Sequence, residues 1–327
     1  MSERFFAGKK ILVTGGMGFI GSNLCRRLVE EGGQVIALDN LYPDFGGNRF
    51  NLAGYEDRLR IVIGDLRDEK VVNELVPDCD FIFHLAGQTS HMDSMREPLN
   101  DLDINARGTV ILLEAGRKSN PACKIVLAST RQVYGTAQYL PVDEKHPCHP
   151  PDVNGINKMA CEQYHLLYHS VHGIRSSLLR LTNTIGPGMR IKDARQTFLG
   201  IWIRLLAEGK PFEVWDGVQL RDFTYVDDAV DAFLIAAQCP EADGEIFNLG
   251  GERSITLNDL AKELVEVAGG EFRVQEFPKE RKKIDIGDYY ADDRKIRRVL
   301  SWQPKVPLKE ALVRTFAYYK TNLKHYI

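Results

Sequence analysis

The stretch that decides the fold is Lys10–Asp39, KILVTGGMGFIGSNLCRRLVEEGGQVIALD. Its first five residues form an apolar run typical of a β-strand, and four glycines follow within the next seven positions. After them Ile20, Leu24 and Leu28 recur every four residues, which predicts an amphipathic helix. Two glycines end that helix, and residues 34–38 predict a second strand. The stretch is therefore a strand, a tight turn, a helix and a strand.

The glycines in the turn suit the close approach of a phosphate group. A turn this tight needs a positive φ or a missing Cβ, and it exposes backbone N–H groups and the positive end of the helix dipole. Asp39 follows about 20 residues later, where a carboxylate accepts hydrogen bonds from an adenosine ribose and repels a 2′-phosphate. Because every element of the pattern is present, it favours dinucleotide binding over a purely structural turn. It predicts NAD rather than NADP as the cofactor.

Composition limits the partners and the compartment. The chain has 327 residues, of which 44% are hydrophobic and 27% charged, and a net charge of −3, so neither nucleic acid nor an anionic membrane is indicated as a partner. Its six cysteines show no metal-binding spacing, which predicts reduced thiols and no metal. We see no membrane-spanning run and no signal-peptide core. These observations predict a cytoplasmic protein.

Strands and helices alternate through the first half of the chain. We expect strands at 60–64, 80–85, 124–128 and 174–181, and helices at about 69–75, 100–119 and 155–171. This alternation predicts an α/β fold with a doubly wound parallel sheet, the Rossmann arrangement, and helices on both faces. In the helix at 100–119 the residues expected to face inward are Leu102, Ile104, Val110, Leu112 and Leu113.

Two polar segments follow predicted strands. Gln88–Ser94 is expected to be a loop at the carboxyl edge of the sheet, where open α/β folds bind ligands. Asp65 has two interpretations that the sequence leaves open. It either meets the adenine of a dinucleotide or caps the helix at 69–75.

The character of the chain changes at about Thr182. Short helices such as 198–208 alternate with short strands such as 212–215 and 246–249. We expect residues 1–181 to form the NAD-binding domain and residues 182–327 to form most of a smaller α/β substrate domain. The boundary is expected to be discontinuous, and the pattern allows part of the second segment to return to the first sheet.

Several separated motifs resemble the extended short-chain dehydrogenase/reductase family, specifically its nucleotide-sugar epimerases and dehydratases. The matching segments, in the order of the chain, are TGGMGFIG at 14–21, DLRD at 65–68, HLAGQ at 84–88, STRQVYG at 129–135, RDFTYVDD at 221–228, FNLGG at 247–251 and WQPKV at 302–306. Since these matches occur in the right order over nearly the whole chain, together they are far more specific than any one of them.

The resemblance implies roles for particular residues. The implied cofactor contacts are Gly15, Gly18, Phe19, Ile20, Gly21, Asp39, Asn40, Asp65, Leu66, Leu85, Ala86, Gly87, Asn105 and Lys158. The implied contacts to a nucleotide-diphosphate sugar are Gln88, Ser90, Thr130, Asn183, Arg190, Arg221 and Arg281. The arginines agree with the chemistry, because a planar guanidinium suits a diphosphate. Thr130 is also implied as the active-site hydroxyl.

The resemblance further implies a homodimer. Family members commonly dimerise through the two helices that correspond to 100–119 and 155–171. Met159, Leu166 and Leu167 offer apolar surface beyond what one face of the sheet needs.

The chain departs from the family at the general base. The family places a tyrosine four residues before the lysine, but four residues before Lys158 the chain has Asn154, which cannot ionise near neutral pH. The base must therefore come from elsewhere or be absent. His91 is the first candidate, because its unperturbed pKa suits proton transfer near neutrality, and Tyr134 is the second.

Three functions remain open at this point. The first is an NAD-dependent nucleotide-sugar epimerase that works through a transient keto intermediate, with an altered active site. The second is a 4,6-dehydratase, which is disfavoured because the positions of its acid pair hold Arg131 and Gln132. The third is a non-catalytic protein that binds NAD and a nucleotide sugar.

Overall fold

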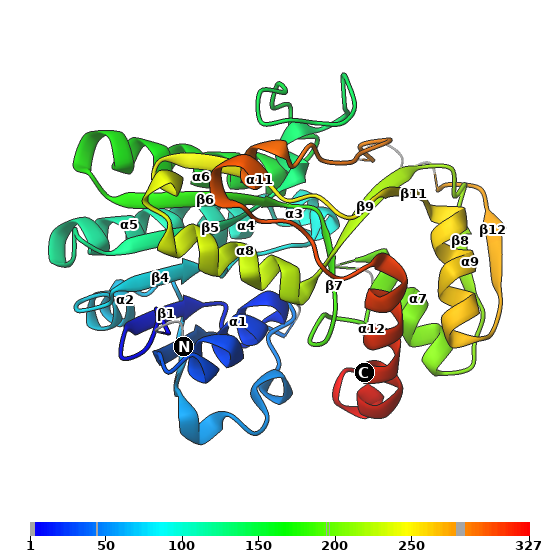
Figure 1. Ribbon diagram of the computed structural model, residues 1–327, viewed down its shortest axis with the longest axis horizontal. Coiled ribbons are helices and arrows are strands. Elements are labelled where there is room, and N and C mark those ends of the chain that lie inside the picture. The colour runs from blue at the N-terminus through cyan, green and yellow to red at the C-terminus, as the bar shows by residue number, and fades with distance from the viewer. Residues whose placement is uncertain (1–3, 44, 194, 196, 279–284) are drawn as a thin grey trace.

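The computed structural model describes residues 4–43, 45–193, 195, 197–278 and 285–327. A seven-stranded sheet forms its centre, with the strands in the order β10-β6-β5-β4-β1-β2-β3 (Figure 1). Every neighbouring pair in this sheet is parallel. The strands are β1 (Lys10–Thr14), β2 (Gln34–Asp39), β3 (Arg60–Ile63), β4 (Phe81–His84), β5 (Lys124–Thr130), β6 (Arg175–Leu181) and β10 (Glu245–Asn248).

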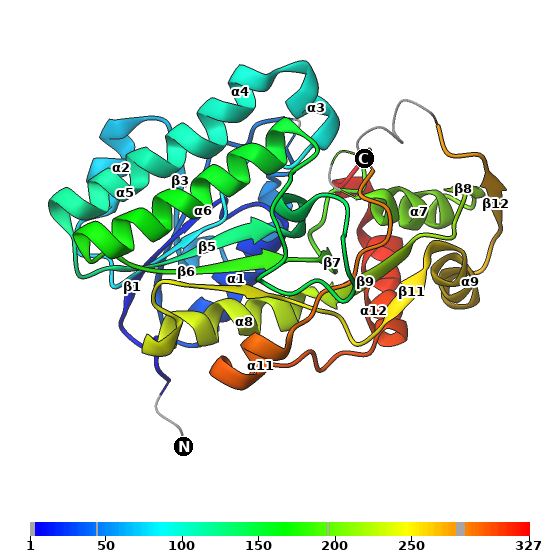
Figure 2. The ribbon, with the colours of Figure 1, turned by 90° about the horizontal axis from the view of Figure 1, so that it is seen from above.

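Helices cover both faces of this sheet (Figure 2). One face carries α1 (Phe19–Glu30) and α8 (Val226–Gln238), and the other carries α2 (Glu69–Leu75), α5 (Gly108–Ser119) and α6 (Val153–His172). Side chains alternate along a strand, so Ile11 and Val13 join the core under α1 while Leu12 joins the core under α5. The predicted doubly wound parallel sheet is confirmed.

A second, smaller group of elements lies beyond the carboxyl ends of the strands (Figure 1). It contains a three-stranded sheet in the order β11-β9-β7 and a two-stranded sheet of β12 and β8. Its elements are β7 (Asn183–Ile185), α7 (Phe198–Ala207), β8 (Phe212–Trp215), β9 (Leu220–Tyr225), β11 (Ser254–Thr256), α9 (Leu257–Ala268), β12 (Phe272–Gln275) and α12 (Leu308–Asn322).

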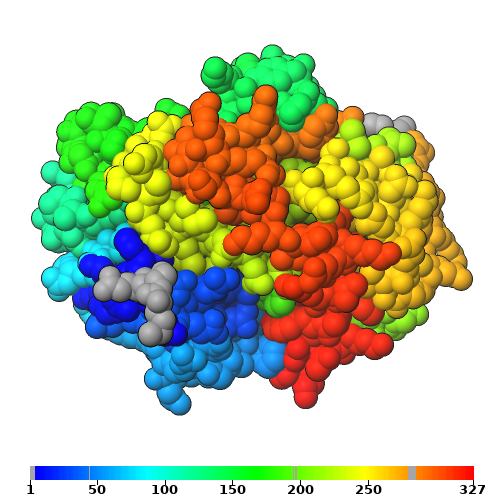
Figure 3. Space-filling model, viewed as in Figure 1, coloured from blue at the N-terminus to red at the C-terminus, as the bar shows by residue number. Residues whose placement is uncertain are grey.

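The two groups of elements are interwoven along the chain. The strand expected at 246–249 is β10, which pairs with β6 at the edge of the large sheet, and α11 (Arg294–Leu300) packs next to it. The last residues return to the N-terminal half: the ring of His325 stacks on Phe50 at 3.8 Å, and Tyr326 Oη donates a hydrogen bond to Asn51 Oδ1 at 2.6 Å. Figure 3 shows the C-terminal part of the chain (red) against the N-terminal part (blue).

The structure differs from the sequence-based prediction in one loop and in one helix. Residues 91–94 of the segment expected as a loop at 88–94 are helical, because Ser90 Oγ accepts a hydrogen bond from Asp93 N and caps α3 (His91–Arg96). The helix expected at 100–119 begins earlier, as α4 (Pro98–Leu102), and passes through a π-helical turn (Asp103–Arg107) into α5. The predicted inward position of Leu102 is wrong, since its side chain is exposed.

The helix at 69–75 is capped by Asp68, whereas the sequence analysis considered Asp65. Asp68 Oδ1 accepts a hydrogen bond from Lys70 N at 2.9 Å, so Asp68 is the N-cap of α2. Asp65 is therefore not the cap, and it accepts hydrogen bonds from Arg67 instead.

Apolar side chains remain exposed on the outer surfaces of α4 and α6. They include Leu99 and Leu102 on α4 and Ile156, Leu167 and Val171 on α6. Of the three residues named from the sequence, only Leu167 is exposed, because Leu166 and Met159 pack against buried clusters. Among the described residues no helix is both long and apolar enough to cross a membrane.

Candidate active site

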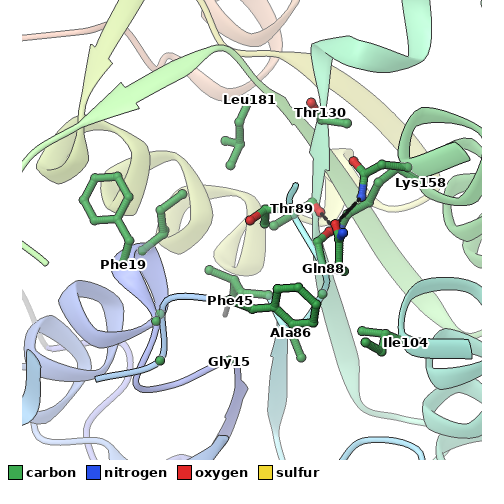
Figure 4. A pocket seen from close by; sticks show the side chains of 18 of the residues that line it. Gly15, Phe19, Phe45, Ala86, Gln88, Thr89, Ile104, Thr130, Lys158 and Leu181 are labelled. Atoms are coloured by element: carbon green, nitrogen blue, oxygen red, sulfur yellow. Dashed lines mark hydrogen bonds between the residues drawn. The ribbon is translucent and has the colours of Figure 1, made fainter. Parts of the chain in front are cut away.

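A pocket lies at the carboxyl ends of the strands, beside the point where the strand order reverses between β1 and β4. Residues from both groups of elements line it. The sequence-predicted site residues that the structure brings together in its wall are Gly15, Gly18, Phe19, Ile20, Gly21, Asp39, Asn40, Asp65, Leu66, Leu85, Ala86, Gly87, Gln88, His91, Thr130, Asn154, Lys158 and Asn183. Figure 4 shows Gln88, Thr130 and Lys158 across the pocket from Phe19.

The glycine turn fits a pyrophosphate. Gly15 has a φ of +69°, and a Cβ there would lie 2.9 Å from Ala86 N, so the turn presses directly on the end of β4. A Cβ at Gly21 would lie 2.1 Å from Gly15 O, which is how α1 can start immediately behind the turn. No side chain caps the N-terminus of α1 at Gly18, so its first N–H groups face the pocket without a side-chain acceptor.

Two carboxylates line the pocket at the carboxyl ends of β2 and β3. Asp39 accepts hydrogen bonds from Met17 N at 3.0 Å and Leu41 N at 2.9 Å, and burial raises its pKa. Asp65 is held by the guanidinium of Arg67, with Nε at 2.9 Å and Nη2 at 2.8 Å, and this contact lowers the pKa of Asp65 to about 2. Asp65 therefore stays ionised and fixed near neutral pH.

Asn154 lies in the pocket wall as a fixed hydrogen-bond donor. Its Nδ2 donates to Gln88 O at 2.7 Å and to Asp101 Oδ2 at 3.2 Å, and the residue is buried. Asp101 is 1% exposed, and it also accepts hydrogen bonds from Asn157 Nδ2 at 2.7 Å and Asn105 Nδ2 at 3.1 Å. Three asparagine amides thus satisfy this buried carboxylate.

The lysine and the threonine of the site come from α6 and the end of β5. Lys158 Nζ donates to Ala128 O at 3.3 Å, and Thr130 Oγ1 accepts a hydrogen bond from Gln132 N at 3.2 Å. Both side chains line the pocket together with Asn154, which lies one helical turn before Lys158.

His91 has a buried acidic partner that the sequence analysis missed. Its Nδ1 lies 2.8 Å from Asp152 Oδ2, which is within ion-pair distance but outside hydrogen-bond geometry, and the Asp152 side chain is completely buried while that of His91 is 40% exposed. Burial acts to raise the pKa of Asp152, but His91, Gly155 N and the amide of Gln132 more than offset it and the pKa is lowered. Asp152 is also the N-cap of α6, so its sequence position alone predicts only a cap.

The structure places several of the sequence-based site residues outside the pocket wall. Tyr134 is fully buried and outside the pocket, its hydroxyl donates to Asn248 Oδ1 at 2.6 Å, and burial raises its pKa. It is therefore a structural residue and no candidate base. Asn105 lies next to Gly87, and its side-chain amide donates to Asp101. Ser90 is the N-cap of α3. Neither residue lines the pocket.

Two of the predicted arginines, Arg190 and Arg221, do not line this pocket either. Arg190 bonds to Asp193 Oδ1 at 2.9 Å and to Pro43 O at 3.2 Å. Arg221 is buried, donates to Gly287 O and pairs with Asp285 at 3.2 Å. Arg281 lies outside the described residues.

Other residues that the sequence analysis did not assign to ligand binding also line the pocket. Tyr42 and Phe45 come from the loop after β2, and their rings stack at 4.6 Å. Ile104 comes from the π-helical turn, and Arg131 and Gln132 follow Thr130. The loop aromatics could not have been placed from sequence, because nothing local indicates that the loop folds over the pocket.

Comparison with known proteins agrees with this geometry. Residues 11–250 match the model of the NAD-dependent epimerase/dehydratase family. The chain belongs to this family. A Methanocaldococcus jannaschii protein that carries the provisional name UDP-glucose 4-epimerase is 35% identical over 95% of this chain and 99% of its own.

Two solved structures show the same fold with bound ligands. A UDP-glucose 4-epimerase from Thermotoga maritima, solved with UDP-glucose, is 32% identical with a TM-score of 0.88 and covers 96% of this chain and 99% of its own. A dTDP-glucose 4,6-dehydratase variant from Streptomyces venezuelae, solved with NAD, is 28% identical with a TM-score of 0.86 over 96% and 98% of the two chains. This chain is thus an NAD-dependent enzyme of the epimerase/dehydratase class.

Proposed function

We propose that the protein epimerises a nucleotide-diphosphate sugar through a transient keto intermediate, with His91 as the general base. NAD, when bound, supplies reversible hydride transfer at a sugar carbon. The single observation that carries the proposal is the contact of His91 with the buried carboxylate of Asp152 in a pocket whose lysine-paired tyrosine is replaced by Asn154. The pocket therefore offers an imidazole beside a carboxylate where the family has a phenol.

The geometry of the pair supports this role. A carboxylate on Nδ1 favours the tautomer that keeps a proton on Nδ1, which leaves Nε2 as the atom that accepts a proton from a sugar hydroxyl. Asp152 also stabilises the imidazolium formed when that proton arrives. Asp152 itself is fixed by Gly155 N at 2.7 Å and by Gln132 Nε2 at 2.8 Å.

The remaining residues are assigned to binding and orientation. Lys158 is placed to hold the nicotinamide ribose and Thr130 to hydrogen-bond a sugar hydroxyl, since both lie in the wall beside the proposed base. Asn154 contributes an amide that is already committed to Gln88 and Asp101, so it orients the wall and moves no proton. Asp39 and the glycine turn are assigned to the adenosine and the pyrophosphate.

The residues of the pocket wall suit epimerisation better than dehydration. Water elimination needs an acid to protonate the leaving hydroxyl, and the positions after Thr130 hold Arg131 and Gln132. The guanidinium stays protonated and the amide does not titrate, so neither side chain can deliver a proton near pH 7. The dehydratase and the non-catalytic binder are outcomes of the following test.

The test is incubation of the NAD-loaded protein with UDP-, GDP-, CDP- and dTDP-sugars, followed by separation of the products. An epimer of unchanged mass, formed with catalytic amounts of NAD, supports the proposal. A product lighter by one water assigns a dehydratase. Binding without conversion of any sugar assigns a binding protein.

A further inference from the structure

Arg131 is a cation in the pocket wall with unused hydrogen-bonding capacity. It directly follows Thr130 and begins a short 3₁₀ turn (Arg131–Tyr134). Its Nη2 donates to Asn183 Oδ1 at 3.1 Å, and its guanidinium lies 5.2 Å from the centre of the Tyr289 ring. Its Nη1 is buried and has no hydrogen-bond partner. A buried N–H without an acceptor is costly, so the group is expected to meet one when the site is filled.

Asp222 and Asp285 attract Arg131 from a distance, but neither forms a direct ion pair with it. Within the described part of the chain, no carboxylate lies within ion-pair distance of it. Asp285 is engaged by Arg221 at 3.2 Å, and Asp222 accepts hydrogen bonds from Thr182 Oγ1 and Ala291 N. Burial lowers the pKa of Arg131, and Arg221 is a second cation close by. Arg131 thus keeps one buried donor, Nη1, that an incoming anion can engage.

The position of Arg131 in the chain places this charge at the reacting end of the pocket. The preceding residue is Thr130, and the following one, Gln132, donates a hydrogen bond to Asp152 at 2.8 Å. Asp152 in turn contacts the proposed base, His91. An anion on Arg131 is therefore expected to belong to the sugar and not to the distant nucleoside.

We propose that Arg131 binds a carboxylate on the sugar ring, so that the substrate is a nucleotide-diphosphate uronic acid. A guanidinium suits this group because its parallel N–H donors match the two oxygens of a carboxylate. This inference rests on the proposed function and deepens it, since it names the substrate class of the same pocket.

The test compares matched ligands that differ only in the charge of the sugar. We would measure binding by calorimetry for UDP-glucuronic acid, UDP-glucose and UDP, and for GDP-mannuronic acid, GDP-mannose and GDP, on the NAD-loaded protein. The variants are Arg131→Gln and Arg131→Lys, with Arg175→Gln as control, because Arg175 pairs with Asp243 at the opposite ends of the strands. NAD content and melting temperature show whether each variant folds.

In at least one series we expect the uronic acid to bind at least about tenfold tighter than the hexose. Arg131→Gln should abolish this preference, Arg131→Lys should restore part of it, and Arg175→Gln should keep it. No preference in either series overturns the inference. An equal loss of affinity for UDP or GDP alone also overturns it, because Arg131 would then serve the diphosphate.

The outcome is separable from that of the proposed function. Epimerisation of neutral sugars with no acid preference leaves the proposed function standing and removes the inference. An Arg131-dependent acid preference without any turnover supports the inference and removes the proposed function.

Discussion

The buried pair of Glu162 and Arg180 allows a sharp prediction about stability. Glu162 lies on α6 one turn after Lys158, and its carboxylate joins α6 to β5 and β6 beneath the site. It accepts hydrogen bonds from Arg180 Nε at 2.8 Å, Arg180 Nη2 at 2.6 Å and Ser129 Oγ at 2.5 Å. The side chains of the pair are 0% and 4% exposed. Glu162→Gln therefore leaves a buried guanidinium without its counter-charge.

Removing one partner of such a pair costs about 3–5 kcal/mol of unfolding free energy. A matched control is Glu266→Gln, because Glu266 pairs with Lys309 at 3.1 Å with both side chains more than half exposed, a class of pair worth about 0–1 kcal/mol. The assay is urea unfolding followed by circular dichroism at a fixed NAD concentration, since bound ligand adds to the apparent stability. A loss below about 1 kcal/mol for Glu162→Gln would refute the reasoning.

Three further predictions concern the cofactor, the assembly and pH. NAD should bind at least about tenfold tighter than NADP, equivalent to ~1.4 kcal/mol from a carboxylate at Asp39, and equal affinities by calorimetry would contradict this. We expect a homodimer by light scattering, and Leu99→Glu combined with Leu167→Glu should give monomers; a monomeric parent would disprove the assembly. Burial lowers the pKa of His165 to about 3 and that of His84 well below its ordinary value. As the pH falls, these two histidines are protonated in the unfolded chain before they are protonated in the folded one. The free energy of unfolding should therefore decrease below about pH 6.5, by about 1.4 kcal/mol per pH unit for each histidine. An unchanged slope for His165→Gln in urea titrations at several pH values would rule out its contribution.

The elements that the sequence predicts well are those whose causes are local. The bounds of β1, α1 and β2 follow from apolar runs and the glycine turn, and nearly all the cofactor-side residues from Gly15 to Gly87 line one pocket as expected. Asn105 is the exception, since only the packed structure shows that its side chain turns to Asp101.

The features that escaped prediction depend on contacts between distant residues. His91 and Asp152 are 61 positions apart, and Asp152 has an ordinary explanation as a helix cap. Arg221 lies in a recognisable motif, but its direction is decided by Gly287 O and Asp285 on another segment. The pairing of β10 with β6 likewise needs the fold, because a short apolar run does not indicate which sheet it joins.

The most direct test of the account is the turnover of His91→Ala with its NAD retained. On the sugar nucleotide that the parent converts, the account predicts a rate lower by at least about 100-fold, the low end for loss of a general base. His172→Ala is the control, since His172 is exposed at the end of α6. Near-normal turnover by His91→Ala would contradict the assignment of His91 as the base.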